Sequence, residues 1–576
     1  MASATLFSRA TNIKATPALV STQSGLRNRP TFRISLKPAG RVQLTTHSQR
    51  KPRALRSVQV ASSADSSTSS GSGTDPLKAV YVPKDLKEDV KVRLVGHFKS
   101  DWLDAANVKS FASILFMFFA SISPAISFGA LLSVATGNAI GAVEVIVATA
   151  VSGVIYAMFS GQPLTIIGST GPVVTYTAIL YGLAAQMGIP FLTFYAWVGL
   201  WSAAILFVCA VTGASNSIKY ITRFTDEIFS GLIAVIFIYE SIKFLVVQNL
   251  MNPLVTPGTA LLSALLGVLT YTVAKATADF KTSKWGGKTL RAVVGDFGPL
   301  IAVATGSCFA FFVFPHIALQ KLALPATLAT TTGRPWITSL AASPQVIFGS
   351  LIPATIGVIL LFLDQNITVR IVNNPDYGLK KPVGYHLDML VLSLLIAVQS
   401  LLGLPWMVAS TAPSIIHLRS LQTLQKNSTT GAEEIVDVKE QRVTALASNA
   451  LIGCSILLIP LLKNIPIAVL SGLFLHLGIQ TAKGNQFIER IGLLLVDPAQ
   501  RTLYMPKYLA QVEERVWIKF TLIQMASFWV LWTVKESKQF GIAFPLVILA
   551  FVPLRYAFKE WFEKKDLERI DPFEMA

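Results

Sequence analysis

Long apolar stretches recur along almost the whole chain from Phe111 onward. A helix needs about 20 mostly apolar residues to cross a bilayer. A shorter amphipathic stretch, Gln486 to Leu495, is expected to lie along the membrane surface. The pattern predicts an all-α polytopic membrane protein with fourteen spans, at roughly 111–132, 139–159, 162–184, 193–213, 226–247, 258–276, 294–315, 344–363, 385–402, 404–421, 443–460, 464–480, 516–534 and 540–558.

Composition agrees with a membrane protein. Of 576 residues, 52% are hydrophobic and 14% charged, and the mean hydropathy is +0.56, whereas charged residues approach a quarter of a soluble protein. Cys209, Cys308 and Cys454 lie far apart in apolar stretches, which predicts small lipid- or core-facing residues and neither a disulfide nor a zinc site. No HExxH or GxSxG motif is present, and Gly286-Gly287-Lys288-Thr289 lacks the earlier glycine of a phosphate loop. We therefore expect neither an enzyme nor an organic cofactor.

The net charge of +18 is concentrated at the N-terminus and does not indicate nucleic acid binding. Residues 1–64 contain eleven Lys and Arg and no Asp or Glu, which leaves 18 − 11 = +7 for the rest. A segment rich in Ser, Thr and Arg that begins Met-Ala-Ser is typical of a plastid transit peptide. A disordered basic cytosolic tail is the alternative. A Ser- and Gly-rich linker, residues 62–73, follows.

Basic loop residues predict the orientation. Loops on the N-terminal side of the predicted membrane contain many Lys and Arg, and the opposite loops contain few. This is the positive-inside pattern of an even number of spans with both termini on one side. After cleavage of a plastid presequence, that side would be the stroma.

Two similar interruptions occur in the third and the tenth predicted spans. The first reads GQPLTIIGSTGP (161–172) and the second reads GLPWMVASTAP (403–413). Each has Gly-x-Pro, a short apolar segment, Ser-Thr, a small residue and Pro. In a fourteen-span chain these are equivalent spans of two seven-span halves. Because seven is odd, the second half would be inserted upside down relative to the first.

Each interruption predicts a helix that begins in mid-membrane after non-helical backbone. Proline is favoured in the first helical turn, and a preceding Ser or Thr can cap the helix. Inverted halves would point the two helix N-termini at each other, each with unpaired N–H groups and about half a positive charge. Such paired breaks indicate a transporter's binding site. Two ordinary proline-kinked helices are the alternative. The predicted anion-binding residues are Ser169, Thr170, Gly171, Ser410, Thr411 and Ala412, with helix-start prolines Pro172 and Pro413.

A few ionisable residues lie inside apolar stretches. Asp364 ends the eighth stretch, and Thr368 follows one turn later on the same face, so the two could offer hard oxygen ligands to a small cation or a proton. Alternatively, Asp364 lies near the aqueous edge, because Arg370 follows closely. Glu144 and Glu240 are interpreted as structural or gating residues. His386 and His417, near helix ends, are interpreted as hydrogen-bonding anchors.

The sequence resembles the solute-carrier bicarbonate transporters, which include anion exchangers, sodium-coupled bicarbonate cotransporters and plant borate exporters. The resemblance covers roughly residues 95–560 and is carried by FASISPAISFG (119–129), SGQPLT (160–165), GPV (171–173), TRFTDE (222–227), GYHLD (384–388) and VKEQRVT (438–444). It implies fourteen spans in two inverted repeats, a homodimer, and an elevator-like movement of a core against a gate domain. It also implies that the anion site lies at the two Ser-Thr breaks.

Within that family, DQNIT (364–368) resembles the sodium-coupled members, in which this Asp helps to hold sodium. Exchangers usually carry Glu there and an Arg at the position of Pro413. The Ser-Thr-Gly-Pro sequence is closer to bicarbonate carriers than to plant borate exporters. Animal members carry Phe-Glu where this chain has Tyr176-Thr177, which leaves the coupling ion and its stoichiometry open.

These observations predict a sodium-coupled symporter of bicarbonate or carbonate in the chloroplast envelope, with the inner envelope favoured. Sodium is expected as a co-substrate. A sodium-independent bicarbonate carrier or chloride exchanger, a borate transporter and a non-transporting membrane scaffold are the alternatives. The expected organisation is a transit peptide (1–64), a linker and surface segment (65–105), core halves (106–225 and 344–461), gate halves (226–343 and 462–560) and a tail (561–576).

Overall fold

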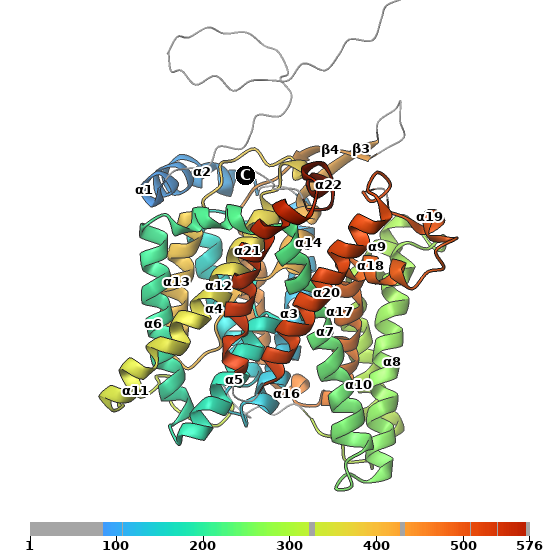
Figure 1. The fold of residues 1–576 in the computed structure, drawn as a ribbon. Coiled ribbons are helices and arrows are strands. Elements are labelled where there is room, and N and C mark those ends of the chain that lie inside the picture. The colour runs from blue at the N-terminus through green and yellow to red at the C-terminus, as the bar shows by residue number, and fades with distance from the viewer. Residues whose placement is uncertain are drawn as a thin grey trace, which may run out of the picture. The chain divides into compact units, whose positions relative to one another are not determined.

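The structure, a computed structural model, describes residues 85–105, 108–321, 329–426, 433–506, 508–537 and 540–571. The predicted transit peptide (1–64) and the Ser- and Gly-rich linker (62–73) lie outside these residues. Within them the chain is mostly helical, which confirms a polytopic helical membrane protein in outline (Figure 1).

Fourteen helices of the described residues lie at the predicted spans, and twelve of them are apolar by length and composition. By length and composition, eight can cross a membrane: α3 (Val108–Ala135), α4 (Ala142–Phe159), α6 (Phe191–Val211), α7 (Arg223–Ile242), α8 (Pro257–Lys281), α12 (Leu351–Val372), α20 (Glu514–Glu536) and α21 (Phe544–Trp561). Four are shorter: α10 (Gly298–Val313), α13 (Tyr385–Leu401), α15 (Val443–Cys454) and α17 (Ile467–Lys483). The last two, α5 (Gly171–Met187) and α14 (Thr411–Leu421), each begin after an extended segment.

Short elements connect these helices. A π-helix (Lys243–Leu250) continues α7, and the predicted amphipathic stretch forms α18 (Gln486–Leu494), as expected. The others are α1 (Leu86–Asp89), a π-helix (Val90–Gly96), α2 (Phe98–Leu103), α9 (Lys288–Asp296), α11 (Pro344–Gly349), α16 (Ile459–Leu462), α19 (Arg501–Tyr504), α22 (Lys564–Ile570) and 3₁₀ turns at Ala214–Tyr220, Pro375–Tyr377, Ser455–Leu458 and Gly541–Ala543. We call the side that carries α1, α2 and α22 the N-terminal face, and the opposite side the far face (Figure 1).

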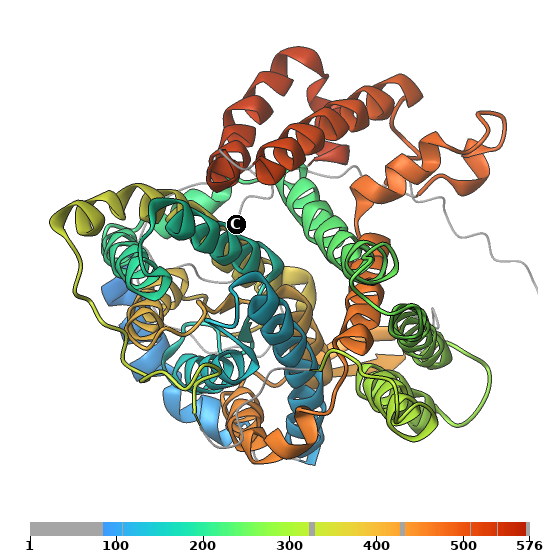
Figure 2. The ribbon, with the colours of Figure 1, turned by 90° about the horizontal axis from the view of Figure 1, so that it is seen from below.

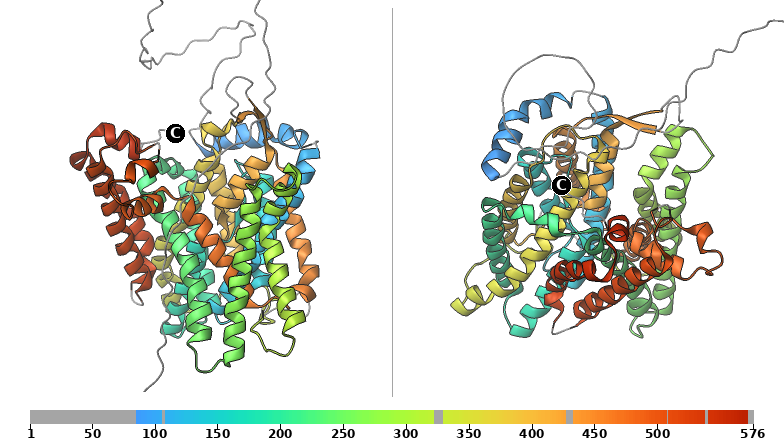
Figure 3. Two further views of the ribbon diagram at one scale, coloured as in Figure 1. Left: turned by 90° about the vertical axis from the view of Figure 1, so that its right-hand side faces the viewer. Right: turned by 45° about the horizontal axis from the view of Figure 1, so that its top comes forward.

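The helices pack in two groups. Helices α3, α4, α6, α12, α13, α14 and α15 pack on one another, together with α5, and we call them the first bundle. Helices α7, α8, α10, α17, α20 and α21 form the second bundle. The bundles meet where α3 contacts α17, α5 contacts α7 and α12 contacts α21. Figure 2 shows the red pair α20 and α21 on one side of the molecule with the blue segments on the opposite side, and the left panel of Figure 3 shows the red segment at one edge.

Two predictions about the elements were wrong. The eighth span was expected to end at residue 363, but α12 continues to Val372. Its last turns contain Asp364, Gln365, Asn366 and Thr368, which are buried against other helices and therefore stay helical although hydropathy falls. The chain is also not purely α-helical. Strands β3 (Gln422–Lys426) and β4 (Glu433–Val438) form an antiparallel hairpin at the N-terminal face, where we expected only a polar loop (Figure 1).

Candidate functional site

Both predicted breaks are present. Helix α4 ends at Phe159 and α5 begins at Gly171, while α13 ends at Leu401 and α14 begins at Thr411. The backbone at the helix starts is extended, with φ −123° and ψ 152° at Thr170 and φ −97° and ψ 112° at Ser410. This excludes two merely kinked helices, because extended backbone separates each helix from its predecessor.

The two breaks pair with each other in a short antiparallel sheet. Strand β1 (Ile167–Gly168) pairs with β2 (Val408–Ala409), with Ile167 opposite Ala409 and Gly168 opposite Val408. Ile167 and Val408 each lie five positions before the proline of their break, and Gly168 and Ala409 each lie four positions before it. In both pairs, the residue five positions before one proline lies opposite the residue four positions before the other. The pairing is therefore unchanged when the two breaks are exchanged, as a two-fold relation between them requires.

Side chains from other helices hold the backbone of the first break. Asp388 Oδ1 accepts hydrogen bonds from the N–H groups of Gly161 (2.8 Å) and Gln162 (3.2 Å). Ser414 Oγ accepts from Ile166 N (2.9 Å), and His417 Nδ1 lies 2.9 Å from Leu164 O. Non-helical backbone at membrane depth survives only when its polar groups are satisfied. The described contacts meet that requirement with partners from the second half of the chain.

The second break is held in the same way, by residues that the sequence analysis missed. Gln399 Oε1 accepts from Met407 N (3.1 Å), and Gln365 Oε1 accepts from Ala409 N (2.9 Å). Tyr195 OH accepts from Trp406 N (3.1 Å). Gln399 lies inside a predicted span and Gln365 just after one, and polar residues in spans are a signal of function in a membrane protein. That signal could have identified the two glutamines. Tyr195 is an aromatic residue in an apolar span, so no such signal marks it.

The helix starts are not capped by the residues expected to cap them. Neither Thr170 nor Ser410 makes a side-chain bond to the first turn of its helix. The Thr170 hydroxyl instead donates to Asp364 Oδ2 (2.5 Å), on α12. The first N–H groups of α5 and α14 therefore keep no capping side chain at these positions, which preserves their positive end for an anion.

Helix α12 lies between the two breaks and contacts both. Asp364 binds Thr170 of the first break, and the Thr368 hydroxyl is 2.7 Å from the Thr411 hydroxyl and donates to Ala409 O (3.2 Å) in the second. Asp364 and Thr368 were expected to offer oxygen ligands to one cation. In the structure, Asp364 bonds to the first break and Thr368 bonds to the second. The residue Asp364 is 4% exposed. Asp364 is therefore buried within the protein.

The remaining predicted residues differ in exposure. Ser169, Gly171 and Pro172 are buried, and Ser169 Oγ lies 3.4 Å from Met407 Sδ. The second break is more open: Ser410, Thr411 and Pro413 are half-buried and Ala412 is exposed. The structure thus places two contacts one helical turn apart on α12, Thr170 with Asp364 and Thr411 with Thr368, and we call these four side chains the oxygen cluster.

The chemistry of this cluster suits a small hard cation beside an anion. Within the described residues no group of three or more His, Cys, Asp or Glu side chains could hold a metal ion. The cluster instead offers one carboxylate, three threonine hydroxyls and a backbone carbonyl. Such oxygen donors favour hard cations over transition metals. One buried carboxylate also needs a positive partner, because an isolated charge in this environment is costly.

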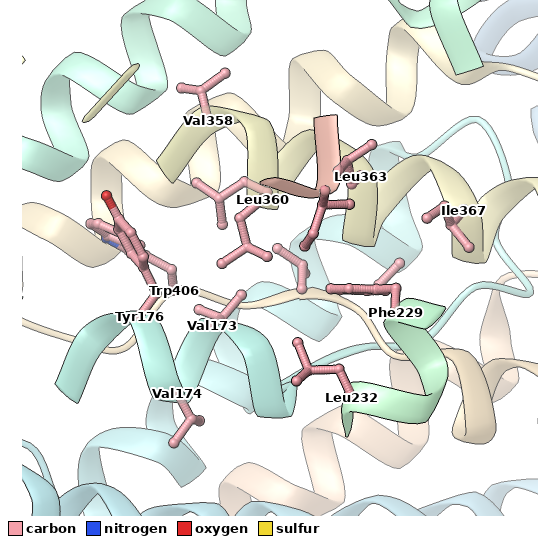
Figure 4. Close-up of a cluster of buried hydrophobic side chains, with 14 of the residues drawn as sticks. Val173, Val174, Tyr176, Phe229, Leu232, Val358, Leu360, Leu363, Ile367 and Trp406 are labelled. Atoms are coloured by element: carbon pink, nitrogen blue, oxygen red, sulfur yellow. The ribbon is translucent and has the colours of Figure 1, made fainter. Parts of the chain in front are cut away.

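Apolar side chains of α5, α7 and α12 pack together beside the first break (Figure 4). Figure 4 shows Val173 of α5, Phe229 and Leu232 of α7, and Leu363 of α12 pointing into one buried region. Tyr176 and Trp406 close the side beside α5 (Figure 4), with their ring centroids 6.4 Å apart. Val173 and Leu363 are close neighbours of Thr170 and Asp364 along the chain, so the first break lies beside this apolar cluster, whereas the second break is more open.

The other singled-out residues have varied roles. Glu144 is structural: its carboxylate accepts from Gly141 N (3.0 Å) and Thr331 N (2.8 Å), which fastens a far-face loop to α4. Glu240 is 3.6 Å from Lys243. His417 is a hydrogen-bonding anchor, as predicted. The ring of His386 is not, because both its nitrogens are buried without a partner among the described residues. Its backbone N–H, not its ring, binds Asp89 (2.8 Å).

The cysteines and Thr177 follow the sequence interpretation. Cys308 and Cys454 are exposed and Cys209 is half-buried. Thr177 donates to Val173 O of its own helix (2.9 Å). The hydroxyl is satisfied locally and makes no contact with Asp364 in the structure. This position therefore lacks a second buried charge.

Comparison with known proteins identifies the family. The sequence profile of the HCO3- transporter integral membrane domain matches residues 82–257 and 246–575, which is nearly all of the described chain. Electroneutral sodium bicarbonate exchanger 1 of Rattus norvegicus is 33% identical over 554 residues, covering 84% of this chain and 50% of that protein. Sodium-driven chloride bicarbonate exchanger of Homo sapiens is 33% identical over 555 residues, covering 84% and 49%.

A third relative, anion exchange protein 3 of Danio rerio, is 34% identical over 534 residues and covers 86% of this chain and 45% of that protein. The chain thus spans about half the length of these curated relatives.

Solved structures share the fold at low identity. The transmembrane domain of the cyanobacterial bicarbonate transporter BicA has a TM-score of 0.51 and 15% identity, covering 73% of this chain and 97% of that one. Murine Slc26a9, an anion transporter solved in the inward-facing state, has a TM-score of 0.55 and 11% identity, covering 82% and 71%.

Proposed function

The chain belongs to the bicarbonate transporter family, and we propose that it is a secondary transporter that carries bicarbonate or carbonate together with sodium. The observation that carries this proposal is the position of Asp364, buried between two uncapped helix starts and bonded to Thr170. An anion at the helix starts and a sodium ion at the carboxylate would each reduce the cost of burying the other.

The residue roles follow from that arrangement. Ser169, Thr170, Gly171, Ser410, Thr411 and Ala412 would bind the anion, and Pro172 and Pro413 would fix the helix starts. Asp364 and Thr368 would hold sodium, with the Thr170 and Thr411 hydroxyls next to them. Pro413 supplies no fixed positive charge at the anion site, so sodium would supply it. Names of the curated relatives that include sodium are consistent with this choice.

We further propose fourteen spans in two inverted seven-span halves. Eight long helices, four shorter ones and the two half-helices α5 and α14 make fourteen within the described residues. The exchange-symmetric pairing of β1 with β2 supports the inversion. The first bundle would be the core, formed by 106–225 and 344–461, and the second bundle the gate, formed by 226–343 and 462–560. An elevator movement of core against gate, in a homodimer, would alternate access to the site.

The proposed location is the chloroplast envelope, with the inner membrane favoured and both termini in the stroma. It rests on the basic, acid-free composition of residues 1–64 and on the basic loops of the N-terminal face. Residues 1–64 fused to a fluorescent protein should enter plastids with loss of the segment. A fusion that stays in the cytosol would identify the segment as a basic tail.

Uptake of labelled bicarbonate into proteoliposomes containing the full chain, with and without an inward sodium gradient, tests the function. Sodium-driven accumulation is expected. Uptake that ignores sodium but requires chloride inside the vesicle would make the chain an exchanger. Borate transport without bicarbonate transport would move the assignment to the borate carriers, and no transport of either anion would leave a scaffold.

A further inference from the structure

Three phenylalanine rings meet at the boundary between the two bundles. Phe128 comes from α3 in the first bundle, and Phe237 and Phe474 come from α7 and α17 in the second. Their ring centroids are 5.6 Å (Phe128 to Phe237), 5.7 Å (Phe128 to Phe474) and 5.7 Å (Phe237 to Phe474) apart, so they form a closed triangle. The residues are 4%, 8% and 6% exposed, respectively. We call them the phenylalanine triad.

One side of the triad contacts the candidate anion site. The Phe237 ring lies so close to Gly171, the first residue of α5, that a Cβ added there would be 3.2 Å from its Cε1 atom. Ile233, one turn earlier on α7, lies at 3.6 Å from the same point. The ring therefore covers the start of the half-helix on its second-bundle side.

The other side of the triad borders a small cavity. Phe474 lines a cavity of about 40 Å³ together with Glu240, Gln248, Ser471, Ala130 and Leu131. These residues belong to the last turns of α3, the end of α7 with its π-helix, and the first turns of α17. All three segments adjoin far-face loops. The cavity lining is mostly apolar but includes Glu240, whose side chain is 26% exposed, so this side of the triad carries a carboxylate that is in part open to the surroundings.

The anion site itself is more open toward the N-terminal face. Ala412, Ile416 and Arg419 are exposed and repeat at helical spacing along one side of α14. Helix α14 runs from the second break to Leu421 and continues directly into β3 at the N-terminal face (Figure 1). The exposed stripe therefore leads from the site toward that face, while the triad lies between the site and the far-face cavity.

We propose that the phenylalanine triad is the barrier that separates the anion site from the far face. Rings in contact leave no path for a hydrated ion, because an ion passing between them would lose its water without gaining polar partners. One ring belongs to the first bundle and two belong to the second. A movement of one bundle against the other separates Phe128 from Phe237 and Phe474 and opens the route through the cavity beside Glu240.

The inference rests on the proposed function only for the identity of the ion that is held back. Accessibility of the site can be measured without any transported anion. In a variant with Cys209, Cys308 and Cys454 replaced by serine, Ala412→Cys reports on the site and Ser471→Cys reports on the far-face cavity. The full chain is reconstituted in vesicles and exposed briefly in the cold, without sodium, to a membrane-impermeant cationic thiol reagent added outside.

Reconstitution inserts the chain in both orientations. Each sample therefore contains molecules whose N-terminal face points outward and molecules whose far face does, and the modified fraction shows from which face the reagent reaches a cysteine. With the triad intact, Ala412→Cys is modified only in molecules whose N-terminal face points outward, and Ser471→Cys only in the complementary fraction. Phe237→Ala or Phe474→Ala should let the reagent reach Ala412→Cys from both sides. The modified fraction should then rise to include nearly all molecules, and the rate from the far face should increase at least tenfold.

Matched variants separate the barrier from a general loss of packing. Phe520→Ala removes an equally buried ring from α20 inside the second bundle, where it packs on Phe224 and Phe558, and should leave the modified fraction unchanged. Phe237→Leu guards against a variant that fails to fold and should give an intermediate rate. Unchanged modification in both alanine variants, with monodisperse protein, overturns the proposal. A working barrier in a protein that transports no bicarbonate would refute the proposed function alone.

Discussion

At the scale of single residues, the structure shows why a few polar side chains occur deep in apolar helices. Asp364, Gln365 and Gln399 all accept hydrogen bonds from the breaks, from the Thr170 hydroxyl or from backbone N–H groups of the extended segment. The sequence predicted Asp364 as functional because a carboxylate inside a span is costly. It could not predict Thr170 as the partner, because that contact joins residues 194 positions apart. Spacing within one helix suggested Thr368 instead.

Asp364→Asn tests the cation role. The asparagine side chain retains an oxygen that can accept from Thr170, but it carries no charge to attract sodium. We expect bicarbonate uptake to lose its dependence on sodium and to fall at least tenfold, while the thermal unfolding temperature changes little. Transport at several sodium concentrations provides the measurement. Glu489→Gln, on the amphipathic helix α18, is the control and should transport normally; full sodium dependence in Asp364→Asn would remove this residue from the mechanism.

At the scale of elements, the two breaks were predicted well and α12 was not. Gly-x-Pro and Ser-Thr before Pro are local signals, and the chain is extended where those signals occur. The end of α12 depends on burial of polar residues against distant helices, which no local pattern records. The hairpin of β3 and β4 was also missed. Its strands pair with each other across residues 427–432, and this polar stretch was expected only as a loop between spans.

Gln399→Leu tests whether side chains hold the second break. Gln399 is 2% exposed, and its oxygen accepts the Met407 N–H. Leucine would leave that N–H without its partner, which costs about 1–3 kcal/mol. Thermal unfolding in detergent should show a lower midpoint, and transport should fall as the break loosens. Ser393→Ala on the same helix is the control, because its hydroxyl bonds only the helix's own Leu390 carbonyl in the described contacts. Equal midpoints for the two variants would contradict this role.

At the scale of the whole molecule, a polytopic helical membrane protein could be predicted, but the packing of the helices into two bundles could not be derived from periodicity. It was expected only from the family resemblance. Long-range polar contacts fix it. Asp571, near the end of the described chain, accepts from Phe224 N (2.9 Å) at the start of α7 and pairs with the guanidinium of Arg555. The segment after α21 thus fastens α7 and α21 together within the second bundle.

Asp571→Ala should destabilise the second bundle. The Asp571 carboxylate and Arg555 are both buried, and removing one partner of a buried pair costs about 3–5 kcal/mol. We expect a clearly lower unfolding midpoint, measured by the same detergent assay. Glu568→Ala is the matched control on the same short segment, since its pair with Lys564 spans 3.9 Å and is exposed to solvent, and it should unfold like the wild type. A midpoint shift equal to that of Glu568→Ala would show that the contact does not anchor α7.

The proposed elevator movement makes a prediction about cross-links between the bundles. Ala130 of α3 and Ser471 of α17 line the same small cavity but belong to different bundles. In the variant without native cysteines, Ala130→Cys with Ser471→Cys, joined by a short bifunctional thiol reagent, should stop bicarbonate uptake, and a reducing agent should restore it. Ser241 and Ser471 both lie in the second bundle, with the Ser241 hydroxyl 2.7 Å from Ser471 O. Cross-linking cysteines at these two positions should leave transport largely intact, because that bundle moves as one body. Full transport through the Ala130–Ser471 cross-link would exclude relative movement of the bundles as the transport step.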